Sequence, residues 1–157
     1  MEGEGHAIAQ AALDWLQANQ PDEEPVALCW GDSRIGNMIF TPTLDSVAAV
    51  LDWEMATLGN PVQDLAWFNY IDSVFAEGLE LPRLPGLPSY EDTVEQWQQA
   101  TGRTAEHYEY YLLFAAMRFC LIMSRIMLAT GQEGDVQENF TCKLLERHLS
   151  RMPKNDS

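Results

Sequence analysis

Two aspartates and an asparagine in the first third of the chain are the residues best suited to chemistry: Asp32, Asn37 and Asp52. Short apolar runs lie before or after them, at residues 26–29, 38–40 and 47–51. Short apolar runs bounded by Gly, Asp and Pro are typical of buried strands, so we expect three strands whose ends bring these side chains together. Their carboxylate and amide oxygens would suit a hard cation such as Mg²⁺.

The motifs around these residues resemble a known family. Gly-Asp-x-x-x-x-Asn lies at residues 31–37, Leu-Asp-Trp-Glu at 51–54 and Gly-Asn-Pro-x-x-Asp-Leu-Ala at 59–66. Together they resemble the aminoglycoside phosphotransferase and choline kinase-like family, closely over residues 30–67 and more loosely to the C-terminus. Three motifs in order form a strong signal, whereas one alone would be weak. The resemblance implies a protein-kinase-like fold and an ATP-dependent enzyme that transfers the γ-phosphate to a small molecule's hydroxyl with Mg²⁺.

The resemblance assigns a role to each of the three residues. Asp32 would be the catalytic base that orients the substrate hydroxyl and accepts its proton, and Asn37 and Asp52 would hold Mg²⁺ through their oxygens. The alternatives are a turn aspartate at Asp32 and, beside Gly36, a turn asparagine that tolerates positive φ at Asn37. Asp52 is harder to explain as structural, because a carboxylate after five apolar residues needs a partner, which a metal would supply.

Three further polar residues are candidates for supporting roles. Arg34 would lie near the transferred phosphate or, equally, face solvent. Glu54 would reach the metal or the acceptor, or be exposed. Asp64 lies in the first turn of an expected helix, where the helix dipole favours a negative charge. By resemblance Asp64 would accept hydrogen bonds from the backbone of the catalytic loop, which is an architectural role.

The sequence departs from the family in two places. The family usually has histidine, a residue that supports the catalytic loop, where this chain has Trp30. Before Trp30 no Gly-rich loop follows a strand, and lysine occurs only as Lys143 and Lys154. We therefore expect the C-terminal lobe alone, without an N-terminal nucleotide lobe, one that associates with such a lobe or with a dimer partner. On this hypothesis the chain alone would bind ATP weakly and turn over poorly or not at all.

Size and composition limit the other possibilities. With 157 residues and 46% hydrophobic content, one domain with its own core is expected. The net charge of −15 argues against nucleic acid as a partner. It fits a cationic acceptor such as an aminosugar or amino alcohol, although solubility is the simpler interpretation. We see no apolar run near the ~20 residues of a membrane span and no signal peptide, and so expect a cytoplasmic protein without a membrane partner.

The cysteines and histidines show no motif. We expect the cysteines to be reduced, mostly buried thiols and neither a disulfide framework nor a zinc site. They are Cys29, Cys120 and Cys142. We expect His6 and His148 to be exposed and His107 to lie near a helix start, none with a partner at metal-binding spacing.

The fold class that this pattern predicts is α+β and mainly α-helical, the C-terminal lobe of the protein-kinase-like fold, with a small β-hairpin or sheet carrying the catalytic and metal loops. Helices are expected at residues 8–16, 61–75, 89–100, 106–130 and 135–151. A hairpin is expected at residues 37–52, an irregular link at 55–59 and an extended loop at 81–88. Asn60, Ser89 with Asp92, and Thr104 are the expected helix caps.

The helix over residues 106–130 is expected to be the central buried helix. Because its Arg118 cannot be buried alone, we expect it to pair with a carboxylate such as Asp64 or Asp72.

Two other functions remain open. A non-enzymatic binding or scaffold module would keep the fold, and an exposed apolar face would support it. A metal-dependent hydrolase would use Asp32, Asp52 and Glu54, but this leaves Asn37 and the helix start at Asn60 without an explanation.

Overall fold

The computed structural model describes residues 6–22, 24–131 and 134–153. It is mainly helical with two small antiparallel sheets, which confirms the predicted fold class. The helices are α1 Ala7–Ala18, α2 Val62–Ser73, α3 Tyr90–Thr101, α4 Tyr108–Thr130 and α5 Phe140–Arg151, with a 3₁₀ turn at Ile35–Asn37 and a π-helical turn at Val74–Gly78. The strands are β1 Ala27–Cys29, β2 Met38–Phe40, β3 Val47–Val50 and β4 Thr57–Gly59.

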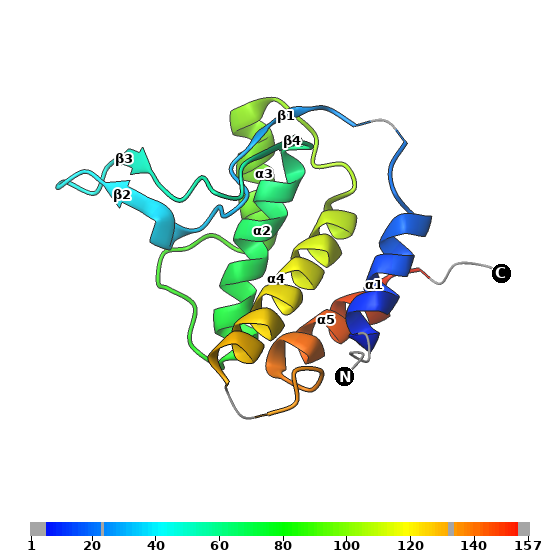
Figure 1. Cartoon of the computed structure of the whole chain (residues 1–157). Coiled ribbons are helices and arrows are strands. Elements are labelled where there is room, and N and C mark those ends of the chain that lie inside the picture. The colour runs from blue at the N-terminus through cyan, green and yellow to red at the C-terminus, as the bar shows by residue number, and fades with distance from the viewer. Residues whose placement is uncertain (1–5, 23, 132–133, 154–157) are drawn as a thin grey trace.

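The core forms around α4, with α2 on one side and α1 and α5 on the other (Figure 1). Four of the helices contribute fully buried side chains to a single cluster: Ala12 from α1, Tyr70 from α2, Leu113 and Cys120 from α4, and Leu145 from α5. The expectation of a central helix at residues 106–130 is therefore confirmed. Burying a leucine such as Leu113 stabilises the fold by about 2 kcal/mol.

By length and composition, α4 is also apolar enough to cross a membrane. This corrects the expectation that no run of that length exists. The core helix of a globular protein passes the same test, and α4 packs against three other helices here.

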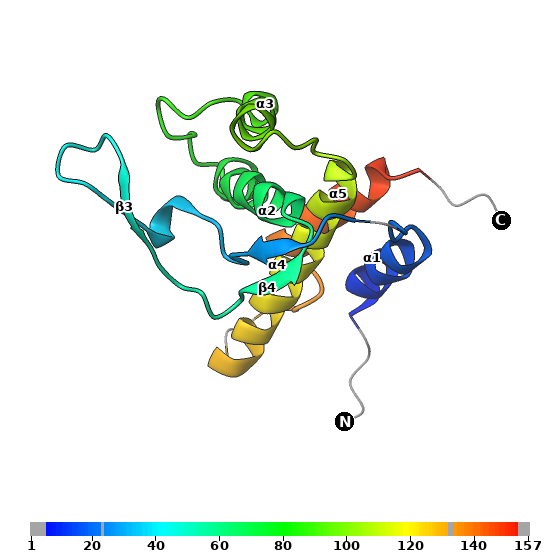
Figure 2. The same cartoon turned by 90° about the horizontal axis from the view of Figure 1, so that it is seen from above.

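The strands differ from the expectation of three buried strands. β1 pairs with β4, and Leu28 lies opposite Leu58. β4 therefore forms in the segment at residues 55–59, which was predicted to be an irregular link. β2 pairs with β3 as the predicted hairpin, which projects away from the helices (Figure 2). Leu28 and Leu58 are 65% and 74% exposed, because a two-stranded ladder has two faces and the helices cover only one of them.

Two helix starts agree with the predicted caps. Ser89 Oγ accepts a hydrogen bond from the Asp92 N–H at 3.0 Å, and the Asp92 side chain accepts from Ser89 N, which completes a capping box. Asn60 Oδ1 accepts from Val62 N at 2.9 Å at the start of α2. These side-chain acceptors satisfy N–H groups that have no partner within the helix.

Two other helix starts were predicted wrongly. Thr104 does not cap α4, because its hydroxyl donates to Glu106 and α4 begins after His107, which has a φ of 58°. The last helix begins at Phe140 and not near residue 135. Asn139 caps it by accepting hydrogen bonds from the N–H groups of Thr141 and Cys142.

Three polar residues also depart from expectation. The Arg118 guanidinium lies 4.8 Å from the centre of the Trp67 ring and has no ion pair among the described residues, while Asp72 pairs with Arg83 at 2.6 Å. His148 is buried, and half-buried His6 contacts two cysteines. All three cysteines are buried and free, as predicted.

Candidate active site

The carboxylate of Asp32 is held by three donors at the end of β1. Its Oδ1 accepts from Trp67 Nε1 at 2.9 Å, and its Oδ2 accepts from Asn37 Nδ2 at 2.7 Å and from Arg34 Nε at 3.0 Å. Only 14% of the side chain is exposed. Since the donors come from the same loop and from α2, the orientation of the carboxylate is set before any substrate binds.

Asp64 anchors the loop at residues 30–37, which carries Asp32 and is named the catalytic loop here after the role expected of Asp32. Its two carboxylate oxygens accept from the backbone N–H groups of Trp30 at 2.6 Å and Gly31 at 2.8 Å. The Ser33 hydroxyl donates to the Asp64 carbonyl at 2.6 Å. Because Asp64 lies in the first turn of α2, these bonds join the catalytic loop directly to a core helix.

Gly31 allows the loop to pass close to its neighbours. Its φ is 92°, a region that glycine adopts without strain. A Cβ added there would lie 2.2 Å from the carbonyl oxygen of Met55. The Gly31 carbonyl accepts a 3.4 Å hydrogen bond from Arg118, so a cation on α4 also supports the loop. Burial lowers the pKa of Arg118, while Asp64 and Asp32 act in the opposite direction.

Trp30 connects the catalytic loop to the loop that carries Asp52. Its indole Nε1 donates to the carbonyl oxygens of Leu51 at 2.7 Å and Asp52 at 3.2 Å. The ring also packs at a tilt against Trp53, with centroids 6.1 Å apart. Asp52 has a φ of 63°, which is uncommon for a residue other than glycine, and the indole holds the backbone at this point.

The structure brings Asp32, Asn37 and Asp52 into one neighbourhood. Asp32 and Asp52 line the same cavity of about 370 Å³. Asn37 does not line it, but donates to Asp32 and, through its carbonyl, accepts from Leu51 N at 2.8 Å. Each residue is therefore linked to the others through the cavity or through a hydrogen bond.

The two candidate substrate-binding residues lie beside the same cavity. Arg34 and Glu54 both line it. Arg34 is engaged with Asp32, whereas exposed Glu54 has no side-chain hydrogen bond or ion pair to the described residues.

The donor set fits a hard divalent cation. Among the described residues, Asn37 Oδ1 and the Asp52 carboxylate accept no hydrogen bond, so both are available as oxygen ligands. Among the described residues, Arg34 is the only cationic side chain that lines the cavity, and its Nε donates to Asp32. Mg²⁺ prefers one or two such ligands together with water and substrate phosphates.

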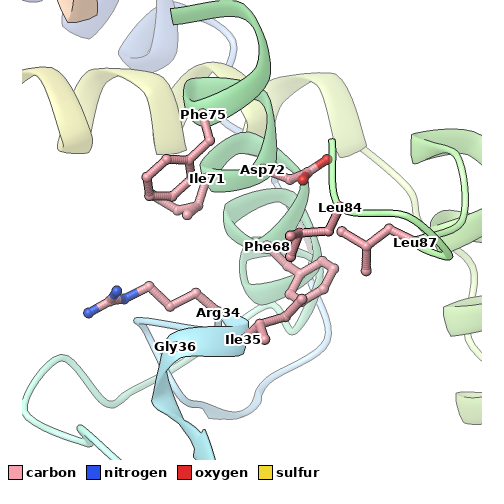
Figure 3. Close-up of a pocket in the computed structure, with 9 residues that line it drawn as sticks. All are labelled: Arg34, Ile35, Gly36, Phe68, Ile71, Asp72, Phe75, Leu84 and Leu87. Carbon is pink, nitrogen blue, oxygen red and sulfur yellow. The ribbon is translucent and has the colours of Figure 1, made fainter. Parts of the chain in front are cut away.

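A second cavity of about 250 Å³ lies between the catalytic loop, α2 and the loop at residues 81–88. Ile35, Phe68, Leu84 and Leu87 gather there, while Arg34 extends away from them (Figure 3). Asp72 also borders the cavity and pairs with Arg83.

Arg83 holds the loop at residues 81–88 in place. It donates to the Pro88 carbonyl at 2.7 Å and lies 4.5 Å from the centre of the Tyr90 ring. The loop therefore forms a defined wall of the second cavity.

Sequence reasoning missed Trp67 at this site, and it expected Arg118 to pair with a carboxylate and not with the Gly31 carbonyl. Trp67 lies three positions after Asp64 and therefore on the same face of α2. This spacing is the one sequence signal that could have identified Trp67. Arg118 comes from a helix more than eighty residues after the catalytic loop, and no local pattern connects the two.

Comparison with known proteins agrees with this geometry. Residues 3–110 match the model of the "Phosphotransferase enzyme family". A crystal structure of a "putative aminoglycoside phosphotransferase" from Ralstonia eutropha JMP134 superposes with a TM-score of 0.68 and 26% identity, over 94% of this chain and 48% of that one.

Two curated relatives match over most of this chain. "Probable acyl-CoA dehydrogenase IBR3" of Arabidopsis thaliana is 31% identical over 146 residues, 81% of this chain and 18% of that protein. "Acyl-CoA dehydrogenase family member 10" of Mus musculus is 29% identical over 145 residues, 85% of this chain and 14% of that protein. The chain thus spans less than a fifth of these relatives, and their names describe proteins of much greater length. Because a family model matches more than half of its residues, and the crystal structure of a "putative aminoglycoside phosphotransferase" superposes on it, the chain belongs to the phosphotransferase enzyme family.

Proposed function

We propose that this chain is the catalytic, acceptor-binding lobe of an ATP-dependent enzyme that transfers the γ-phosphate to a hydroxyl group of a small molecule. The observation that carries the proposal is the carboxylate of Asp32, fixed by three donors at a cavity that Asp52 also lines. Phosphoryl transfer needs little covalent chemistry from the protein, and depends on positioning and charge.

Asp32 would orient the acceptor hydroxyl and take its proton. A carboxylate has about four lone-pair positions, of which the three donors occupy three. The remaining position, on Oδ1 beside the Trp67 indole, is where an acceptor hydroxyl would donate. Asn37, Arg34 and Trp67 would keep the carboxylate pointed at the hydroxyl, because each donates a charge-assisted hydrogen bond to it.

Asn37 Oδ1 and the Asp52 carboxylate would hold Mg²⁺. The ion would offset negative charge on the phosphate oxygens of ATP. Arg34, already at the cavity, would add positive charge near the transferred group, and Glu54 would contact the acceptor or a water bound to the ion.

The second cavity supports a small acceptor with an apolar portion. Its wall is mainly apolar, with one carboxylate, Asp72, at its border. An amino group on the acceptor would be compatible with that carboxylate and with the net charge of −15.

Tryptophan indole signals provide a direct test of the metal site. Mn²⁺ can replace Mg²⁺, and it broadens NMR signals of nearby nuclei. We expect Mn²⁺ with ATP to broaden the indole N–H signals of Trp67 and Trp30, which bond to Asp32 and to the Asp52 loop. The Trp15 signal, from an indole bonded to Pro153, should stay sharp. Equal broadening of all three signals, or the same pattern in Asp52→Ala, would contradict the proposal.

Phosphate transfer tests the chemistry. With ATP, Mg²⁺ and a panel of amino alcohols and aminosugars, any ADP formation that requires the acceptor should fall at least ~100-fold in Asp32→Asn. The chain alone is expected to be slow, because its lysines, 143 and 154, lie far in sequence from the catalytic loop. Phosphate-ester cleavage with metal and without ATP would instead favour the hydrolase.

A second candidate function, a binding module, is favoured by one observation. Leu28 and Leu58 face each other across the β1–β4 ladder and are largely exposed, as is Val26. If this surface mediates self-association, sedimentation should show a dimer that Leu58→Glu dissociates. A monomer in both proteins would remove this candidate.

A further inference from the structure

Three potential metal ligands from three different helices meet on the side of α4 that faces α1 and α5. His6 lies at the start of α1, Cys120 in the middle of α4 and Cys142 in the first turn of α5. His6 Nε2 lies 3.7 Å from Cys120 Sγ and 3.6 Å from Cys142 Sγ, and the two sulfur atoms are 3.6 Å apart. The three donor atoms thus form a nearly equilateral triangle.

This spacing is that of a zinc coordination shell. Zn–S bonds of about 2.3 Å and Zn–N bonds of about 2.0–2.1 Å at tetrahedral angles place two sulfurs roughly 3.8 Å apart and a sulfur and a nitrogen roughly 3.6 Å apart. All three separations here agree with these values within about 0.2 Å.

The surroundings also suit an ion. Cys120 is fully buried and Cys142 is 4% exposed. The contacts that replace a metal are weak, since thiols donate poorly: the Cys142 thiol bonds to the Val136 carbonyl at 3.3 Å. Nδ1 of His6 is buried and has no hydrogen-bond partner among the residues that the structure describes.

A path and a fourth position are both present. A cavity of about 390 Å³ reaches Cys142 and is lined by Glu138 and Glu146 together with Lys143. Its two carboxylates favour entry of a cation. Ser124 Oγ lies 3.2 Å from His6 Nε2, which places a hydroxyl beside the triangle. Within the part of the chain that the structure describes, His6, Cys120 and Cys142 form the one group of this kind, so water or Ser124 would complete the shell.

We propose that His6, Cys120 and Cys142 bind one Zn²⁺ ion, which fastens the start of α1 to α4 and α5. Binding converts two thiols to thiolates, so each ion that enters releases two protons to solvent. The site shares no lining residue with the Asp32 cavity and does not depend on the proposed phosphotransfer. Its ligand set of one imidazole and two thiolates selects a soft or borderline ion over Mg²⁺.

Co²⁺ is the probe that tests the site, because thiolate-bound Co²⁺ has a charge-transfer absorption band that oxygen-bound Co²⁺ lacks. In reduced, metal-free protein we expect a band that saturates at one Co²⁺ per chain and disappears when one equivalent of Zn²⁺ is added. Release of two protons per ion should follow in unbuffered solution. The absence of a saturating band in the wild-type protein would overturn the proposal without any variant.

Variants assign the ligands. His6→Asn, at the N-cap of α1, should weaken Co²⁺ binding more than ~100-fold. Cys142→Ser should weaken binding and reduce the charge-transfer band, because only the Cys120 thiolate remains. Cys29→Ser is the matched control, because Cys29 is also a buried free thiol but lies on β1, and it should bind Co²⁺ as the wild type does. Circular dichroism confirms that each variant is folded. A folded His6→Asn that binds Co²⁺ as tightly as the wild type would overturn the assignment.

A Cys120–Cys142 disulfide is the competing use of the pair. It would lower the mass of the unreduced protein by two hydrogens and leave one titratable thiol. If the protein isolated without reductant shows this mass and, after full reduction, binds no Co²⁺, the zinc proposal is wrong.

Discussion

Asp64 takes no part in the proposed chemistry, yet it holds the backbone of the catalytic loop through bonds of 2.6 and 2.8 Å. Both of its oxygens accept backbone N–H groups, from Trp30 and Gly31. Asp64→Asn would replace one acceptor oxygen by an NH₂ group that faces a donor, so one bond is lost and the other loses its charge. We expect the free energy of unfolding to fall by about 2–4 kcal/mol, measured by urea denaturation.

Asp72 is the matched control, because it lies on the same helix but pairs with the side chain of Arg83, which is 32% exposed, and not with the backbone of the catalytic loop. Asp72→Asn should cost no more than ~1 kcal/mol. Equal losses in the two variants would mean that the carboxylate of Asp64 does not anchor the loop.

Trp30 stands where the family usually has histidine, and its indole reaches two carbonyls of the Asp52 loop. Trp30→Phe keeps the ring against Trp53 but removes the donor. We expect faster amide hydrogen exchange at residues 51–54 and a stability loss of about 0.5–1.5 kcal/mol. Trp53→Phe is the control, because its indole donates to Val50 at the end of β3 and, among the described residues, makes no hydrogen bond to the catalytic loop. If exchange at residues 51–54 is unchanged in Trp30→Phe, the indole does not hold the Asp52 loop.

Sequence motifs could indicate which residues belong to the site but not how they are held. Asp32, Asn37 and Asp52 stand in motifs of fixed spacing, and the structure places them in one neighbourhood. The contacts of Trp67 and Arg118 depend on how α2 and α4 pack across the loop. Packing between segments distant in sequence leaves no local pattern, so one sequence without relatives does not reveal it.

Among the elements, α5 carries a histidine whose ionisation is coupled to packing. Burial, and then Arg151, lowers the pKa of His148 to about 4, against an ordinary value of 6.5. Glu77 opposes this shift, and Arg147 adds to it. The ring lies edge-on to Tyr70 of α2, with centroids 5.6 Å apart. The helix C-terminus would favour a charged histidine, so the loss of hydration outweighs it here.

This shift makes the docking of α5 sensitive to pH. Between pH 6.5 and about 4 the unfolded chain binds a proton at His148 that the native protein does not. The contribution of neutral His148 to the free energy of unfolding is therefore fully present above pH 6.5. It falls as the pH decreases toward 4, by up to about 3 kcal/mol. Urea denaturation of wild type and His148→Leu across this range should show the smaller pH dependence in the variant. If the free energy of unfolding varies with pH in the same way in both proteins, His148 is not the source of the pH dependence. The carboxylates, which both proteins share, would then account for it.

The elements also show where pattern reasoning succeeds. Helices were located because apolar periodicity and caps such as Ser89 and Asn60 are local signals. The burial of the strands could not be predicted in the same way. An apolar run such as residues 26–29 has the same composition on a covered sheet and on an open two-stranded ladder. The start of α5 was placed too early, since Asp135 and Asn139 are both good caps and only tertiary packing decides between them.

For the whole molecule, the dominant feature is charge. The net charge is −15 over 157 residues, and the described residues form three ion pairs, each between an arginine and a carboxylate. Repulsion among the excess carboxylates disfavours the compact state. Salt shortens the range of this repulsion, from about 10 Å at 0.1 M to about 3 Å at 1 M. The melting temperature should therefore rise with NaCl, equivalent to a gain on the order of 1 kcal/mol.

The same titration separates screening from specific binding. At equal ionic strength NaCl and KCl should raise the melting temperature alike, because both act only through screening. MgCl₂ should raise it further if Asn37 and Asp52 take up the ion, since a ligand that binds only the native state adds stability by mass action. Asp52→Ala should remove the excess effect of MgCl₂ and keep the NaCl effect. A melting temperature that falls with NaCl would show that the three ion pairs outweigh the repulsion, and that the negative surface is not a net cost to this fold.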